Sequence, residues 1–382
     1  MSIFVALTVY ATITDAREFI AFSTLYLVVQ SVIGIFSAPL STSIAASTAA
    51  AGIWRRGLIG QAAPVVVGLI LITAVAAPFA VSLLSQEPPK ASASFIALAC
   101  GATVATDAVL GALAGQGKTR EVMFGDAARG VLGACAILGF GYVYGPLAAV
   151  IAVTGSELLV TLVLLGAVAD QRRFRRRGRT IDHALTSTGV ASNLFIQVAM
   201  FAHQALMSAF YGPAVIAAFT IANRFASFSI LLPMLLTKNT VGLLGRAAGQ
   251  SRDAFWQAFK KYAAQVSALT LVTAVAAPLA AFLFFKPLLD KYPPSGALLI
   301  VLTVAGVPSA LATALGTFCI VRRRLRIWLA SDLCFLVVVP VFVLAVHAMD
   351  LGPVIAMCAL PVGYLAIVLA RLPILSTQGG SS

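Results

Sequence analysis

The chain has 382 residues, of which 10% are charged and 60% are hydrophobic. A soluble globular domain carries about 25% charged residues, so this composition, together with a mean hydropathy of +0.99, excludes a soluble protein. Apolar runs long enough to span a bilayer recur along the whole sequence, and at about 20 residues per span they predict an all-α polytopic membrane protein with about 12 transmembrane helices.

The predicted spans follow one another through short connections. They cover residues 1–13, 19–44, 58–84, 92–115, 122–143, 146–169, 187–210, 214–244, 261–285, 296–320, 327–348 and 353–372. The first span is short, because its 13 residues cover only about 20 Å of a hydrocarbon core of about 30 Å. We therefore expect either a truncated first helix or a short or tilted one.

Basic residues predict the orientation of the chain in the membrane. The net charge is +13, and most Lys and Arg residues gather in every second loop. The basic segments are residues 55–56, 118–120, 172–179, 246–261, 322–326 and the tail at Arg371. Since basic loops stay on the cytoplasmic side, both termini are predicted to be cytoplasmic. These charges suit anionic membrane lipids, and we expect no nucleic-acid partner.

The sequence contains an internal duplication. Residues 71–80 return as residues 271–280 with eight identities in ten, at an offset of 200. Later landmarks keep the same order: Asp126 and Asp332 each follow a basic turn, at an offset of 206. Gly-Pro pairs at 145–146 and 352–353 correspond at an offset of 207.

The duplication predicts two parallel six-helix repeats. The expected N-terminal half covers residues 1–170 and the C-terminal half covers residues 187–375. A basic cytoplasmic linker at 171–186 joins them, and residues 376–382 form a tail. Parallel repeats are typical of transporters whose halves face each other across a central pathway.

Ionisable groups at membrane depth are costly and are functional candidates by default. Arg224 lies about 16 Å from the outer end of its predicted span, near the midplane. Lys238 returns to nearly the same helix face, and Asn223 is a polar neighbour. These three residues are candidates to line a hydrated cavity and bind substrate. For Lys238, an extension of the side chain to the cytoplasmic interface is the open alternative.

Further charges lie within the predicted spans of the N-terminal half. Asp107 and Arg129 occur on consecutive antiparallel helices, and we expect them to form a structural ion pair. Glu157 lies near the midplane, with no basic neighbour in its own helix. It is a candidate for coupling H⁺ or Na⁺ to transport, or a buried hydrogen-bonded acid. Asp126 and Asp332 are expected to anchor their loops.

The seventh span is unusually polar. Asn193, Gln197 and Gln204 follow helical spacing and form one stripe, which indicates either hydrogen bonds between helices or contacts with a polar substrate. His203 is a second ion-coupling candidate.

Enzyme signatures are missing from the sequence. Residues 112–119 fit a loose phosphate-binding loop, but an apolar span precedes them instead of a strand, so we expect no nucleotide. The three histidines are scattered and the five cysteines lie in apolar segments without metal spacing. We predict no catalytic residue, no metal site and no cofactor.

The two six-span halves, the basic linker and segment 211–225 (Tyr-Gly-Pro-Ala-Val-Ile-Ala-Ala-Phe-Thr-Ile-Ala-Asn-Arg-Phe) resemble the multidrug/oligosaccharidyl-lipid/polysaccharide (MOP) flippase superfamily. More narrowly, they resemble bacterial polysaccharide flippases of the O-antigen and capsule type. The resemblance covers almost the whole chain. The short first span departs from the family, in which that helix helps to line the cavity.

The resemblance implies an inner-membrane flippase that moves an undecaprenyl-diphosphate-linked oligosaccharide without ATP. The implied partners are this lipid-linked oligosaccharide, membrane lipids and polysaccharide polymerase machinery. Arg224 is the expected phosphate ligand, because a guanidinium binds phosphate strongly. A cation-coupled multidrug antiporter of the same superfamily, a non-transporting membrane scaffold and a membrane glycosyltransferase remain as alternatives.

Overall fold

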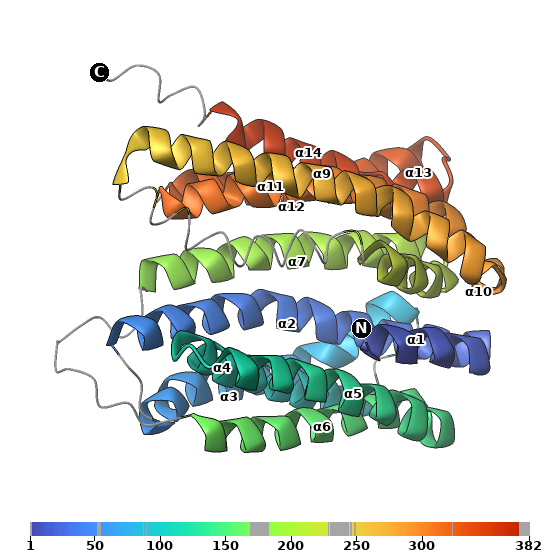
Figure 1. Ribbon diagram of the computed structural model, residues 1–382. Helices are drawn as coiled ribbons and strands as arrows, with labels where there is room; N and C mark the ends of the chain where they lie inside the picture. Colours follow the sequence, from blue (N-terminus) through green and yellow to red (C-terminus); the bar gives the residue numbers. More distant parts are fainter. Residues whose placement is uncertain are drawn as a thin grey trace. The chain divides into compact units, whose positions relative to one another are not determined.

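The computed structural model describes residues 2–51, 55–86, 88, 90–168, 183–227, 229, 244, 247, 250–322 and 324–373. It is all-helical (Figure 1). Among these residues, ten helices are long and apolar enough to cross a membrane, and a shorter apolar helix covers Ala214–Ser227. The predicted polytopic membrane fold is therefore confirmed.

The chain divides into two compact units, Met1–Gln197 and Val198–Ser382, called the N-terminal and C-terminal units below. The N-terminal unit contains α1 (Ser2–Ile13), α2 (Ala16–Ala51), α3 (Arg55–Ser85), the 3₁₀ helix η1 (Ala91–Phe95), α4 (Ile96–Gly115), α5 (Thr119–Tyr144), α6 (Pro146–Ala167) and the start of α7 (His183–Tyr211). Helix α4 is its centre and packs against α2, α3 and α6, while α5 packs against α6 and α1 (Figure 1).

Glycines allow α2 and α4 to approach closely. A Cβ atom at Gly111 would overlap the carbonyl oxygen of Ser41, and one at Gly115 would overlap that of Ala45. Small residues four apart are the usual basis of close helix packing in membranes, where dispersion contacts rather than water exclusion drive association. The Gly111 face of α4 thus fixes α2 against the centre of the unit.

Gly145 alone connects α5 to α6. Its φ of +86° is a left-handed value that favours glycine, and Pro146 opens the next helix. The two helices consequently fold back on each other. Arg129 precedes this turn by 16 residues and Glu157 follows it by 12, so the hairpin brings both side chains to a similar depth.

The C-terminal unit contains the end of α7, the helix Ala214–Ser227, α9 (Arg252–Phe284), α10 (Lys286–Lys291), α11 (Ser295–Val321), α12 (Leu325–Ala348), α13 (Pro353–Met357) and α14 (Ala359–Arg371). Helix α11 packs against α9 and α14, and α12 packs against α14 (Figure 1). The predicted last span, 353–372, is broken at Cys358 into α13 and α14.

The duplicated segments occupy equivalent surfaces in the two units. On α3, Leu71 and Val75 are exposed, and their equivalents Leu271 and Val275 on α9 are exposed as well. Both helices also carry an internal proline, Pro78 and Pro278. Apolar residues exposed at the same positions indicate that both segments present this face to lipid.

Two predicted boundaries differ from the structure. Helix α9 begins at Arg252 and not at residue 261, because Ser251 caps it: the Ala254 N–H donates to Ser251 Oγ over 3.1 Å. The basic residues there had indicated a loop, but Phe255, Phe259 and Tyr262 form a buried helical stripe.

The division between the two units falls within α7, whereas the predicted linker was 171–186. Residues 171–182 of that linker lie outside the described residues, and so does most of 228–243, the second half of the predicted span 214–244. The predicted half boundaries stay a prediction. Helix α1 has 12 residues, as the short first span predicted.

Candidate functional site

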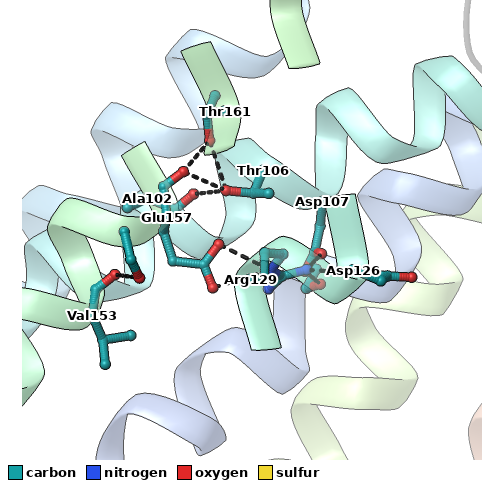
Figure 2. A network of polar contacts seen from close by, with 10 residues as sticks. Ala102, Thr106, Asp107, Asp126, Arg129, Val153, Glu157 and Thr161 are labelled. Carbon is teal, nitrogen blue, oxygen red and sulfur yellow. Dashed lines mark hydrogen bonds and ion pairs between the residues drawn. The ribbon is translucent and has the colours of Figure 1, made fainter. Parts of the chain in front are cut away.

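A charged cluster lies within the membrane-spanning helices of the N-terminal unit. Asp107 is the twelfth of 20 residues in α4, Arg129 the eleventh of 26 in α5 and Glu157 the twelfth of 22 in α6. Figure 2 shows the three side chains converging, with Arg129 between the two acids. All three therefore lie well inside the length of their helices.

Arg129 joins both carboxylates. Its Nη1 atom is 2.6 Å from Asp107 Oδ1, and its Nε atom is 2.9 Å from Glu157 Oε2. The side chains of Arg129, Asp107 and Glu157 are 18%, 17% and 7% exposed. Asp126 is 3.9 Å from Arg129 Nη1 but is 63% exposed, so water screens it more strongly.

Hydroxyl groups hold the helices around this cluster. Thr106 Oγ1 lies 2.6 Å from Thr161 Oγ1, and both hydroxyls donate to the Glu157 carbonyl oxygen, over 3.2 and 2.8 Å (Figure 2). Ser37 on α2 donates to the second carboxylate oxygen of Asp107. These bonds fix α4 against α6 and tie the Asp107 carboxylate to α2.

The cluster borders a cavity of about 180 Å³ between α2, α4, α5 and α6. Asp107, Arg129 and Glu157 line one part of it, and Tyr26 and Gln30 of α2 line another. A space of this size can hold several water molecules, and the polar side chains within its largely apolar lining give them partners. The charged groups therefore border a space that can hold water.

The cluster carries one uncompensated negative charge when both acids are ionised. A single guanidinium neutralises one of the two carboxylates, and Asp107 and Glu157 bind that guanidinium from opposite sides. Leaving a net charge at membrane depth is expensive. One proton or one Na⁺ ion would neutralise it, which is the chemistry required of a coupling site.

The equivalent positions of the C-terminal unit hold no such charges. Arg129 corresponds to Phe335 at the offset of 206 that relates Asp126 to Asp332, and Glu157, which follows the Gly-Pro turn, corresponds to Tyr364 at the offset of 207. These two residues are also in contact, since the centroids of the Phe335 and Tyr364 rings are 4.8 Å apart. The packing of the repeat is thus retained without the ion pairs, so the fold does not require them.

The expected Asp107–Arg129 pair is present, but it is one side of a larger cluster. The sequence did not predict the bond between Arg129 and Glu157, because only the α5–α6 hairpin shows which faces of these helices meet. Their similar distance from the Gly145 turn was the available signal.

Asp332 differs from its expected role. It is fully buried; the Nη2 atom of Arg371 on α14 donates to Asp332 Oδ1 over 2.5 Å, and the Nε atom of Arg371 donates to Ser331 Oγ over 2.8 Å. Arg371 was counted among the cytoplasmic tail charges. It is instead 3% exposed and ties α14 to α12, so Asp332 anchors a helix rather than a loop.

The polar residues of the seventh span are divided between the two units. Asn193 Nδ2 donates to the Gly34 carbonyl oxygen over 3.1 Å, and the Gln197 amide fills the space beside Gly34. These contacts join α7 to α2, which was one of the two predicted roles. Gln204 and His203 are buried in the C-terminal unit, and the His203 ring centroid lies 6.5 Å from that of Phe219.

Arg224 and Asn223 lie half-buried on the helix Ala214–Ser227. Exposed Ser227 donates to the Asn223 carbonyl oxygen over 2.5 Å, so these three residues mark the polar edge of an otherwise buried helix. Lys238 lies outside the described residues. Within the described part of the chain, no three His, Cys, Asp or Glu side chains are grouped as metal ligands.

The described helices form a multi-pass membrane fold that is similar to solved structures of MOP superfamily transporters. An inward-facing multidrug resistance MATE family transporter of this superfamily matches with a TM-score of 0.75 and 16% identity, over 99% of this chain and 95% of that one. An outward-facing structure of such a transporter matches with a TM-score of 0.70 and 16% identity, over 99% and 95%.

A third similar structure is a MOP superfamily transporter from Pyrococcus furiosus, for which a reversed polarity of the binding pocket suggests a different function. Its TM-score is 0.73 at 17% identity, over 98% of this chain and 90% of that one. Neither the scan of protein-family models nor the search of curated proteins found a match. At these identities, the similarity establishes the fold.

Proposed function

We propose that this chain is a cation-coupled flippase that moves an undecaprenyl-diphosphate-linked oligosaccharide across the bacterial cytoplasmic membrane by alternating access. The Asp107–Arg129–Glu157 cluster carries the proposal, since it places one excess negative charge at membrane depth within a transporter fold. The fold is common to transporters of different substrates. The choice of a lipid-linked glycan rests on the sequence resemblance and on Arg224.

The cluster supplies the coupling step. Binding of one H⁺ or Na⁺ removes the net charge of the cluster, and its release restores that charge. The cation-bound and cation-free states therefore differ in the free energy needed to keep the cluster within the membrane. A transport cycle can use this difference when the cavity is open alternately to each side of the membrane. Glu157 is the acid that we assign to this exchange, because it is the more buried of the two.

Arg224 supplies the substrate contact. A diphosphate cannot cross hydrocarbon without compensating charge, and a guanidinium offers bidentate hydrogen bonds to it. Arg224 and Asn223 stand on the polar edge of their helix, where such a headgroup can be bound. Polar side chains of α7 remain candidates for contacts with the sugar.

A second candidate function, export of organic cations, is favoured by the lining of the N-terminal cavity. Phe22 and Tyr26 border it together with Asp107 and Glu157, and aromatic and acidic side chains suit a cationic drug. Two of the similar structures are described as multidrug resistance transporters. Arg129 counts against this candidate, because it offsets one of the two acids.

One reconstitution experiment separates the two functions. The purified chain is placed in proteoliposomes, and the transfer of a fluorescent undecaprenyl-diphosphate oligosaccharide between leaflets is measured beside the uptake of a fluorescent organic cation. We expect lipid transfer and no cation uptake. Arg224→Ala should slow the transfer roughly tenfold or more, because it removes charge-assisted hydrogen bonds worth about 1.5–3 kcal/mol.

Arg326→Ala is the matched control, since Arg326 is exposed and should leave transfer unchanged. Arg224→Lys keeps the charge but not the fork of donors, and should transfer at an intermediate rate. Cation uptake without lipid transfer would replace the flippase by the antiporter. Lipid transfer that is unaffected by Arg224→Ala would remove Arg224 from the mechanism.

A further inference from the structure

A guanidinium stacked on an aromatic cluster lies at one end of the C-terminal unit. Arg322 follows the last residue of α11, and its Cζ atom is 4.3 Å from the centroid of the Phe255 ring at the start of α9. Phe318 of α11 lies beneath, with its ring centroid 5.3 Å from that of Phe255 and 5.5 Å from that of Trp256. The stacking satisfies the face of the guanidinium.

The edge of the same guanidinium is not satisfied. The Nε and Nη2 atoms of Arg322 are buried and have no hydrogen-bond acceptor among the described residues. No acid of the described chain forms an ion pair with it, and the neighbouring Asp253 is exposed. A planar fork of donors that is held in place by rings and lacks an acceptor is suited to an anion with several oxygens.

Other charges at this end of the unit are also positive. Exposed basic residues are present on α9 and on the turn between α11 and α12; they are Arg252, Lys260, Lys261, Arg324 and Arg326. Clusters of this kind next to a membrane span attract anionic headgroups. Trp256 is half-buried beside them, and tryptophan favours the interface between membrane and water.

The N-terminal unit shows that the fold does not require this arrangement. At the offset of 206, Phe318 and Arg322 correspond to Ala112 and Gln116. There, the turn is closed by Lys118, whose Nζ donates to the Ala167 carbonyl oxygen over 2.5 Å. The aromatic cluster and its guanidinium are thus an addition to one copy of the repeat.

We propose that Arg322 and the rings beneath it bind the phosphate of an anionic phospholipid in the leaflet that faces this end of α9 and α11. The phosphate oxygens accept from the buried edge of Arg322, and the surrounding Lys and Arg residues attract the headgroup. A lipid rather than a free anion is the expected source, because the site lies at the end of α9, whose exposed side chains further along the helix are apolar, as at Leu271 and Val275. This site is independent of the substrate that the transporter moves.

Native mass spectrometry of the full chain, released from detergent in the presence of defined lipids, tests the site. We expect phosphatidylglycerol to be retained and phosphatidylcholine not. Arg322→Ala should weaken the retention of phosphatidylglycerol roughly tenfold, which is the effect of losing about 1.4 kcal/mol. Lys286→Ala, which removes an equal but exposed charge beyond the opposite end of α9, should change it less than about twofold.

Equal retention of phosphatidylglycerol by Arg322→Ala and the unchanged chain would overturn the proposal, as would an equal loss of retention in Lys286→Ala. Displacement of the lipid by millimolar inorganic phosphate would assign the site to a soluble anion instead. If Arg322→Ala does not fold, Arg322→Lys replaces it, since lysine keeps the positive charge and the aliphatic part of the side chain. Its retention of phosphatidylglycerol should still fall several-fold, because lysine lacks the planar pair of N–H donors. Retention unchanged in Arg322→Lys would then reject the assignment.

Discussion

Arg129 is the cation that two buried carboxylates share. Each acid is at least four-fifths buried, and the guanidinium offers separate donors to Asp107 and Glu157. Removing one partner of a buried ion pair costs about 3–5 kcal/mol, because the remaining charge stays desolvated. The cluster should therefore be sensitive to the loss of its cation and tolerant of the loss of all its charges together.

Arg129→Met tests this dependence. We expect it to destabilise the chain by about 3 kcal/mol, because both carboxylates lose their cation. Thermal unfolding in detergent, followed by tryptophan fluorescence, should show a lower melting temperature.

The triple variant Arg129→Met, Asp107→Asn, Glu157→Gln is the matched comparison. It removes every charge of the cluster while keeping similar side-chain volumes, so it should recover part of the lost stability. A melting temperature of Arg129→Met equal to that of the unchanged chain would show that the guanidinium does not stabilise the two acids.

Charged residues were easy to find in the sequence, but their partners were not. Asp107 and Arg129 could be paired because they lie on consecutive helices at similar depth. The partner of Asp332 is 39 residues away on α14, and nothing in the spacing shows that Arg371 turns inward. Pairing depends on the rotation of each helix about its axis, and near-uniform apolar sequences specify that rotation weakly.

The helices themselves follow from the sequence because hydrogen bonding leaves a chain in lipid few alternatives. Apolar runs located the spans, including the short α1 and the segments duplicated in α3 and α9. The start of α9 was placed too late, since a basic amphipathic turn resembles a loop when only hydropathy is considered. Close packing was not predicted either, because it depends on where a glycine meets a carbonyl group.

Gly111→Ala tests the contact between α2 and α4. A Cβ there would overlap the backbone of Ser41, which cannot move without shifting α2. We expect a loss of about 1–3 kcal/mol from overpacking. Thermal unfolding of the purified variant gives the measurement.

Gly155→Ala is the control for that substitution. Gly155 lies on α6, and no atom lies within 4 Å of the position that a Cβ would occupy there. Alanine at this position should therefore be neutral or should stabilise the helix by up to about 1 kcal/mol. Similar melting temperatures for Gly111→Ala and Gly155→Ala would mean that α2 and α4 do not meet as closely as the structure indicates.

The two units share the packing of a repeat but differ in where they carry charge. The N-terminal unit has its ion pairs at mid-span beside a cavity, whereas the equivalent positions of the C-terminal unit hold the uncharged residues Phe335 and Tyr364. The C-terminal unit instead has a buried pair between Asp332, the eighth residue of α12, and Arg371, the last residue of α14. Duplication thus supplied two similar scaffolds, and we infer that cation exchange is assigned to one of them.

Gradient-driven transport by Glu157→Gln should decide whether the cluster couples cations to transport. Proteoliposomes containing the unchanged chain, Glu157→Gln or the exposed control Asp126→Asn are given an imposed H⁺ or Na⁺ gradient, and lipid-linked oligosaccharide transfer is followed. We predict that one gradient accelerates transfer by the unchanged chain and by Asp126→Asn, while Glu157→Gln no longer responds to it. An equal response of Glu157→Gln to the gradient would contradict the assignment of coupling to this cluster.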